Sequence, residues 1–491
     1  MADKSDSMEV MEDGIGSFLS RYKHLIGLVL SLIVGIAFFT MPPLPGLTVE
    51  GNRVLGSLLV WIILLLVEIA DAAVITLLWL VFLVVTNLTT SDVAFSGFTG
   101  KTTWLLIGAM MLGVAASKTG LAKRIAYWIL TFSGEKYKSL TIWLMVSGAI
   151  LGVIMPSGTA RMAVYIPIYM GLCEVMKIEK DSRTAVNLAM FMIWSASIGA
   201  GSMMWLTGSV LNPIMTEALT AFGVNIGWTR YALFAIPSAI ILSFIIYYSI
   251  HFIVPAENPV IFGGKDVIKA EFDKLGPAKV EEKKALTMFC ICVLFWIIGS
   301  YIEKSLGLNL HNAWVAMIFG SLLFFPKIGV LQGKDFKAIS WNAVFFIGAS
   351  LAISGIMEEA GVAAWAGEYL VAPIMTPFSH LGFFGTVIGL YLVCQLLHIL
   401  IPSGTGTVAI AVPILVTWGL SHGIDPELMG HLTLHGMRPF IFPFEHTPAV
   451  LIFGFGFMTM GKFVKVGTFV SITCILWYLI SAYMWSFMVA M

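Results

Sequence analysis

Two short motifs with the composition Pro-Ser-Gly-Thr lie in the middle of long apolar stretches. The first spans Pro156–Thr159 and the second spans Pro402–Thr405. Proline removes a backbone donor, glycine permits a tight reversal, and the two hydroxyls can bind beside the freed backbone groups. N–H groups at a helix amino end favour an anion, whereas carbonyls and hydroxyls suit a small cation. We therefore expect the motifs to bind an anion together with a coupling cation.

The two motifs belong to an internal repeat. Residues 154–168 and 400–414 align at a fixed offset of 246, and seven of the fifteen positions are identical. Upstream, Ile107–Ala109 matches Ile347–Ala349 in the same order. Each repeat unit holds five expected spans, so the second unit enters the membrane upside down. Inverted repeats with helices broken at mid-membrane are typical of secondary transporters.

The composition is that of a membrane protein. Of the 491 residues, 58% are apolar and only 11% are charged, whereas soluble domains are about 45–50% apolar and about 25% charged. A chain this poor in charge cannot cover a water-facing surface, which excludes a soluble enzyme. The formal net charge of zero gives no excess of basic residues for binding nucleic acid. The apolar composition makes a lipid bilayer the expected surroundings.

The pattern of apolar stretches predicts an all-α polytopic membrane protein with about 11 transmembrane helices and two inverted-topology repeats. Each repeat holds a re-entrant hairpin (140–176 and 380–418), with a motif at its tip, and a broken helix (186–222 and 431–461). The other spans are expected near 24–41, 54–69, 72–88, 102–117, 231–254, 286–302, 312–326, 340–357 and 466–489. The expected domains are a cytoplasmic head with the first helix (1–50), the first repeat (51–254), a cytoplasmic linker (255–285) and the second repeat (286–491).

The basic residues predict the orientation. With a cytoplasmic amino terminus, 22 of the 28 Lys and Arg fall on the inner side and four on the outer side. The first-repeat loop 118–138 carries five of them, whereas its counterpart 358–379 carries none. This asymmetry predicts a cytoplasmic amino terminus and an external carboxyl terminus. The expected location is the plasma membrane, as a multi-pass protein of a bacterial inner membrane.

These features resemble the divalent-anion/sodium symporter (DASS) family from about residue 50 onward. The segment Pro156–Arg161, which reads PSGTAR, is similar to the Pro-Ser-Asn-Thr-Ala-Arg of the bacterial citrate and tartrate:succinate exchangers. The resemblance implies a homodimer in which each subunit moves a transport part past a fixed scaffold, as in an elevator. It implies no cofactor, with sodium as a candidate coupling ion.

The resemblance also implies the site residues. Substrate-binding residues would be Ser157, Gly158, Thr159, Ser209, Ser403, Gly404, Thr405, Thr447 and Pro448, and cation ligands would be Ser157, Gly208, Ser403, Gly404 and His446. Arg161 adds a further substrate-binding candidate, because its fork can bind an additional acidic oxygen. The alternative role for Arg161 is structural, capping the hairpin.

This sequence departs from the family pattern at its tips. Both signature Asn positions are glycine, Gly158 and Gly404, so two side-chain oxygens that would hold sodium are absent. Arg161 brings a fixed charge to the first tip, and Glu445 with His446 brings a titratable pair to the second break. We therefore expect transport to depend less on sodium than in the symporters, and to run as anion exchange or with protons. His398 and Arg438 are further ionisable residues within apolar stretches.

The expected function is secondary active transport of small di- or trivalent organic anions, such as succinate, tartrate or citrate, as cation-coupled symport or as anion exchange. A transporter of sulfate or a small sulfonate in the same family is the first alternative, and an anion channel is the second. A membrane-embedded enzyme would need a constellation such as His-Glu-x-x-His, which the sequence lacks.

Overall fold

The computed structural model describes residues 3–257, 259–260, 263–307, 310–401, 404–456 and 458–490. Within these ranges the side chains of 3–21, 198, 200, 300, 301, 303, 304 and 306 are outside the description. Every element assigned in this described part of the chain is a helix. The all-α class is therefore confirmed.

The helices of the first half run from the amino end to the linker. They are α1 (Asp3–Thr40), α2 (Val49–Leu66), α3 (Ala72–Val85), α4 (Ser91–Ala94), α5 (Ser96–Thr99), α6 (Lys101–Thr119), α7 (Leu121–Leu130), α8 (Tyr137–Ile154), α9 (Gly158–Val175), α10 (Arg183–Ile193), α11 (Ala200–Met203), α12 (Leu211–Ala218) and α13 (Trp228–Ile253). Short turns of tighter or wider helix, η1 (Thr131–Ser133), η2 (Trp194–Ile198), η3 (Leu206–Gly208) and η4 (Leu219–Phe222), connect some of them.

The second half follows the linker helix α14 (Gly264–Lys274). Its helices are α15 (Val280–Leu306), α16 (Asn312–Leu322), α17 (Trp341–Glu359), α18 (Val362–Ala366), α19 (Ala372–Ser379), α20 (Gly382–Leu400), α21 (Gly404–Ser421), α22 (Pro426–Gly436), α23 (Thr447–Phe453) and α24 (Met460–Val489), with the turns η5 (Gly333–Ala338), η6 (Gly367–Val371) and η7 (Pro443–Glu445).

The two halves repeat one order of elements. A helical hairpin, α8–α9 or α20–α21, precedes a broken helix, which is α10–η2–α11–η3–α12 in the first half and α22–η7–α23 in the second. A long unbroken helix, α13 or α24, follows each broken helix. The predicted hairpins and interruptions are thus confirmed. Proline removes a backbone donor and glycine permits a reversal, so a motif that combines the two can end a helix.

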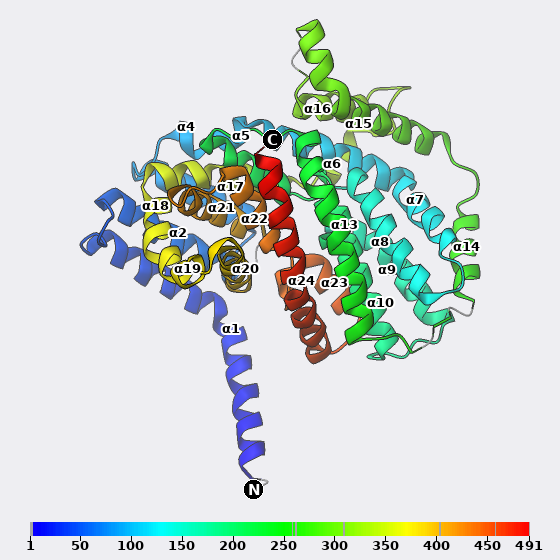
Figure 1. Ribbon diagram of the computed structural model, residues 1–491, viewed down its shortest axis with the longest axis horizontal. Coiled ribbons are helices and arrows are strands. Elements are labelled where there is room, and N and C mark those ends of the chain that lie inside the picture. Colours follow the sequence, from blue (N-terminus) through cyan, green and yellow to red (C-terminus); the bar gives the residue numbers. More distant parts are fainter. Residues whose placement is uncertain are drawn as a thin grey trace.

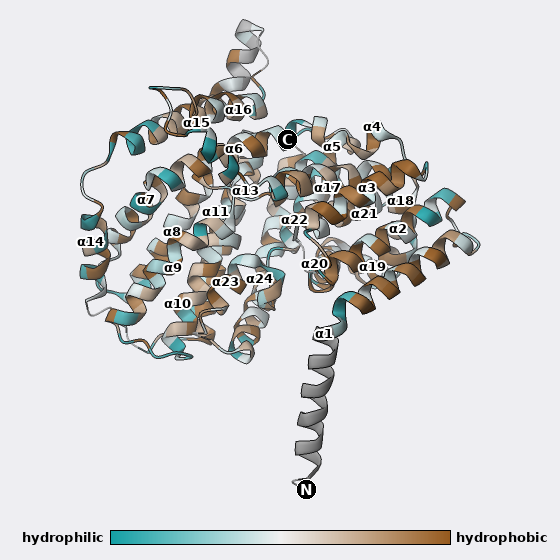
Figure 2. Cartoon of the chain, turned by 180° about the vertical axis from the view of Figure 1, so that it is seen from behind, coloured by the Kyte–Doolittle hydropathy of each residue, from teal (hydrophilic) through white to brown (hydrophobic). Residues whose placement is uncertain are grey.

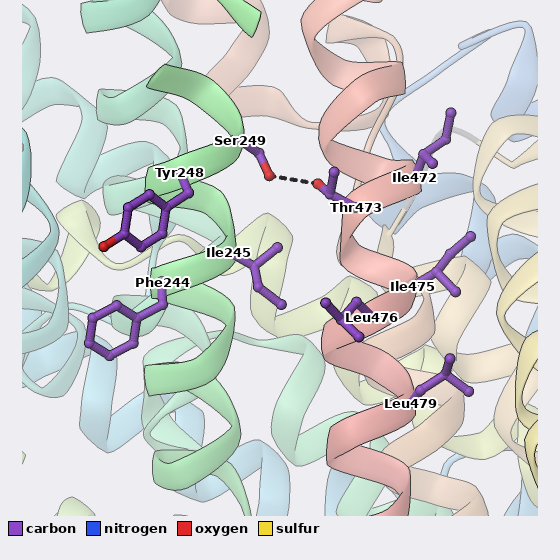
Figure 3. Close-up of a pocket in the computed structure, with 9 residues that line it drawn as sticks. All are labelled: Phe244, Ile245, Tyr248, Ser249, Ile472, Thr473, Ile475, Leu476 and Leu479. Atoms are coloured by element: carbon purple, nitrogen blue, oxygen red, sulfur yellow. Dashed lines mark hydrogen bonds between the residues drawn. The ribbon is translucent and has the colours of Figure 1, made fainter. Parts of the chain in front are cut away.

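Helices α13 and α24 run side by side through the middle of the molecule (Figure 1). Figure 1 places α8, α9 and α10 on one side of this pair and α17 to α21 on the other. Hydrogen bonds join the pair, including Ser238 to Ser481 at 2.6 Å and Ser249 to Thr473 at 2.8 Å. Figure 3 shows the groove of about 600 Å³ beside the latter bond. Its lining is apolar apart from hydroxyls, which suits lipid rather than an anion.

Nine helices within the described residues are long and apolar enough to span a membrane, or ten if the bent pair α6–α7 is one span. This result confirms a multi-pass membrane protein. The predicted count of 11 transmembrane helices is not confirmed, partly because α3 and α16 are apolar but shorter than 18 residues.

The linker between the halves is docked on the first repeat. Arg124 of α7 forms an ion pair with Glu282 at 2.5 Å and donates to the carbonyl of Gly276 at 2.9 Å. Ile268 of α14 is buried. Figure 2 shows hydrophilic residues gathered on α7 and α14, as expected for a segment at the membrane surface.

Candidate functional site

Each Pro-Ser-Gly-Thr motif separates the two helices of a hairpin. Helix α8 ends at Ile154 and α9 begins at Gly158, with the Ser157 hydroxyl accepting a hydrogen bond from the Ala160 N–H at 3.2 Å. Helix α20 ends at Leu400 and α21 begins at residue 404. Both hairpins therefore direct the amino end of an 18-residue helix toward their tips. Ser403, predicted as a substrate and cation ligand, lies outside the described residues.

Glycines allow the first hairpin to pack closely against the first broken helix. A Cβ atom built at Gly152 would lie 1.8 Å from the carbonyl oxygen of Gly201. At Gly148 it would lie 2.2 Å from the carbonyl oxygen of Ser195. No side chain fits at either contact, so α8 and the broken helix meet backbone to backbone, as small residues allow inside membranes.

The tips and the breaks of opposite repeats also meet. A Cβ at Gly158 would lie 3.0 Å from the Ser197 Cβ and 3.3 Å from the Pro448 Cγ. A Cβ at Gly404 would lie 3.6 Å from the methyl groups of Leu211. The first tip thus packs against the second break, and the second tip packs near the first break. A side chain at Gly158 would require these neighbours to shift by a few tenths of an ångström, whereas a Cβ at Gly404 would fit at ordinary contact distance.

One cavity of about 1010 Å³ lies where the tips and breaks converge. Volumes of about 300–1,000 Å³ are usual for small-molecule sites. Nine of the predicted site residues line it: Ser157, Gly158, Thr159, Ser209, Gly404, Thr405, His446, Thr447 and Pro448. The structure therefore brings together residues of the two repeats that are about 246 positions apart in the sequence.

Arg161 and Gly208 are not among the residues that line this cavity. Arg161 is 0% exposed, and its guanidinium donates to the carbonyl oxygens of Ala196 at 2.5 Å and Gly208 at 2.9 Å. It also donates to the carbonyl of Met155 and to the Ser202 hydroxyl. The guanidinium is thus held by four oxygens that come from the hairpin tip and the broken helix. One of them, the Gly208 carbonyl, is a predicted cation ligand.

Arg438 lines the cavity and is held by residues that the sequence analysis did not single out. Its Nη2 donates to the Asn212 Oδ1 at 2.6 Å, and its Nε donates to the His435 Nδ1 at 2.7 Å. The position of Arg438 within an apolar stretch was a usable signal. Its partners were not, because Asn212 is 226 residues away in the sequence.

Glu445 and His398 form a second ionisable group at the cavity. The Glu445 Oε1 accepts hydrogen bonds from the backbone N–H groups of Phe442 at 2.7 Å and Ile441 at 3.1 Å. The other carboxylate oxygen lies 3.5 Å from the His398 Nδ1. Glu445 and His446 thus both lie in the cavity wall, where the sequence places a titratable pair.

The cavity extends to an ion pair at the end of α6. The Lys118 Nζ lies 2.5 Å from the Asp335 Oδ2, which also accepts a hydrogen bond from the Gln332 N–H at 2.6 Å. The hydrogen bond from Lys118, supported by the Gln332 N–H, lowers the pKa of the Asp335 carboxyl. The pair is therefore charged at neutral pH and joins the two repeats at the cavity rim.

Comparison with known proteins identifies the family. The profile described as "Sodium:sulfate symporter transmembrane region" matches residues 22–491. The chain belongs to this family. It is 23% identical over 474 residues to the sodium-dependent dicarboxylate transporter SdcS of Staphylococcus saprophyticus, covering 92% of this chain and 89% of that protein. A membrane protein of Cupriavidus necator is 24% identical over 480 residues, with 92% and 90% coverage.

A solved structure supports the fold. The crystal structure of the YdaH transporter of Alcanivorax borkumensis superposes with a TM-score of 0.51 and 15% identity, covering 95% of this chain and 97% of that one. The family assignment makes the chain a membrane transporter of small anions and not an enzyme.

Proposed function

We propose that the protein carries small di- or trivalent organic anions, such as succinate, tartrate or citrate, in the cavity between the two hairpin tips. The single cavity shared by both tips and both breaks supports this function. A relative named as a sodium-dependent dicarboxylate transporter aligns over 92% of the chain. The substrate carboxylates would meet the N–H groups at the starts of α9 and α21 and the hydroxyls of Thr159, Ser209, Thr405 and Thr447.

We also propose that Arg161 acts as a positioning residue that reduces the need for sodium. Its guanidinium is bound by three carbonyl oxygens and one hydroxyl. Oxygens of these kinds are the ligands that hard metal cations prefer. A fixed cation near the first tip stabilises a dianion, and exchange of one anion for another needs no sodium. The candidate ligands for any coupling sodium remain Ser157, Gly208, Ser403, Gly404 and His446.

The proposed cycle is an elevator movement within a homodimer. Lys118 lies at the cavity rim, in the last turn of α6, and begins the segment 118–138 that the charge distribution assigns to the cytoplasm. The cavity would therefore face the cytoplasm in this conformation. Transport would require the hairpins and broken helices to move together past the scaffold until the cavity opens on the other side.

Uptake into proteoliposomes tests this function. Radiolabelled succinate is added outside vesicles that are empty or preloaded with succinate, with choline replacing sodium. We expect saturable uptake that internal succinate stimulates and that persists in choline. A steep sodium requirement without stimulation would contradict exchange, and the absence of saturable uptake of succinate, tartrate and citrate would contradict the substrate class.

Sulfate or a small sulfonate is the alternative substrate class. The space beside Gly404, where a Cβ would meet atoms at 3.6 Å, favours it because a bulkier tetrahedral group could approach the second tip. Competition by sulfate and methanesulfonate against succinate uptake distinguishes the two classes. An anion channel would show no counterflow in the same vesicles.

A further inference from the structure

Arg438 is a buried cation in the cavity wall without an acidic partner. The residue is 4% exposed. Among the described residues, the ion pairs of Asp and Glu join other cations, and none includes Arg438. A charge buried in this way is costly unless it is paired and hydrogen-bonded.

Neutral groups hold the Arg438 guanidinium in place. Asn212 accepts from Nη2 through its Oδ1, while its own Nδ2 donates to the carbonyls of Ser202 at 2.8 Å and Trp205 at 2.7 Å. His435 accepts from Nε through Nδ1, so this ring is unprotonated at that nitrogen. The guanidinium is therefore oriented by its neighbours but not neutralised.

The acids that line the cavity are engaged elsewhere. Asp335 is paired with Lys118 at the rim. Glu445 accepts two backbone hydrogen bonds and lies against His398. The described lining contains no further Asp or Glu, so the charge of Arg438 is available to an anion that enters the cavity.

We propose that Arg438 binds a second acidic group of the transported anion and so selects dianions over monoanions. This inference rests on the proposed function and names the residue that sets the charge requirement. A guanidinium fork matches the oxygens of a carboxylate or sulfonate. The bound acidic group then compensates the charge of Arg438, whereas in the empty cavity this buried charge has no acidic partner among the described residues. Return of the empty carrier is disfavoured, which makes transport an exchange.

A pair of isosteric probes tests the inference. Succinate and succinamate differ in one carboxylate, which is an amide in succinamate, and calorimetry of the purified protein measures the affinity for each. We expect the wild-type protein to prefer succinate roughly ten- to a hundredfold, as for one charge-assisted contact. Arg438→Gln should reduce the ratio of the affinities for succinate and succinamate to nearly one. The control Arg183→Gln changes an exposed arginine outside the cavity, and this variant should keep the wild-type preference for succinate.

A second variant covers the case in which Arg438→Gln does not fold. Arg438→Lys keeps a positive charge at this position but lacks the guanidinium fork, so the preference for succinate should fall severalfold. An unchanged preference in a folded Arg438→Gln protein, or in Arg438→Lys, overturns the inference. A wild-type protein that binds neither probe removes the proposed substrate class, and the inference with it.

Discussion

Replacing Arg161 with glutamine should destabilise the protein strongly although the residue is absent from the cavity wall. Four oxygens would lose their donor, namely the carbonyls of Met155, Ala196 and Gly208 and the Ser202 hydroxyl. Each bond to a charged donor is worth about 1.5–3 kcal/mol. The glutamine amide can satisfy about two acceptors, because its NH₂ group carries two hydrogens, and water from the cavity can reach others. We therefore expect a net loss of roughly 3–5 kcal/mol, similar to breaking a buried ion pair.

Equilibrium unfolding in mixed detergent micelles measures this loss. Arg183→Gln is the matched control, because its ion pair with Glu257 at 3.7 Å is exposed and should contribute less than about 1 kcal/mol. A loss for Arg161→Gln no larger than that of the control would refute the bonding assigned to the guanidinium. In proteoliposomes, sodium should stimulate residual uptake more in Arg161→Gln than in the wild type, because the oxygens freed by the substitution can bind the ion.

Three further predictions concern the tips, the topology and the rim. Thr159→Ala and Thr405→Ala should each weaken succinate binding roughly two- to tenfold in calorimetry without unfolding the protein. Unchanged affinity in both variants would show that the hairpin tips do not contact the substrate. A membrane-impermeant thiol reagent added outside cells should label a cysteine placed at Glu359 and spare one placed at Lys136, and the reverse pattern would invert the topology. Because its lysine partner lowers the pKa of Asp335, the pair should stabilise the protein above the unfolded-state pKa of about 3.9. This contribution should disappear as the pH falls through the lower folded-state pKa. Unfolding temperatures between pH 6 and pH 3 should therefore fall less steeply for Asp335→Asn than for the wild type, and parallel curves would contradict the role of the pair.

The hairpins and the broken helices were predictable because their causes are local. A motif that combines proline and glycine can end a helix within an apolar stretch, and Pro156–Thr159 accordingly marks the end of α8 and the start of α9. The fixed offset between the repeats then placed the equivalent reversal near residue 404. Convergence of the two tips on one cavity followed from the opposite orientation of the repeats.

The contacts of the buried arginines were not predictable, because they depend on packing between distant segments. Arg161 bonds to carbonyls up to 47 residues away, and Arg438 bonds to Asn212, 226 residues away. Backbone carbonyls carry no sequence signal. The position of Arg161 in the sequence therefore could not decide between a substrate-binding and a structural role. The count of spans was uncertain for a related reason: α16 is only 11 residues long, and its length depends on its neighbours.

We expect one bound anion to contact both hairpin tips in a single cavity. A cryo-EM structure of the protein in lipid nanodiscs with saturating succinate tests it most directly, with a map from protein without succinate as the control. We expect succinate-dependent density between the hydroxyls of Thr159 and Thr405, with one carboxylate extending toward Arg438. Density that contacts one tip alone, or that lies outside this cavity, would contradict a binding site shared by the two tips.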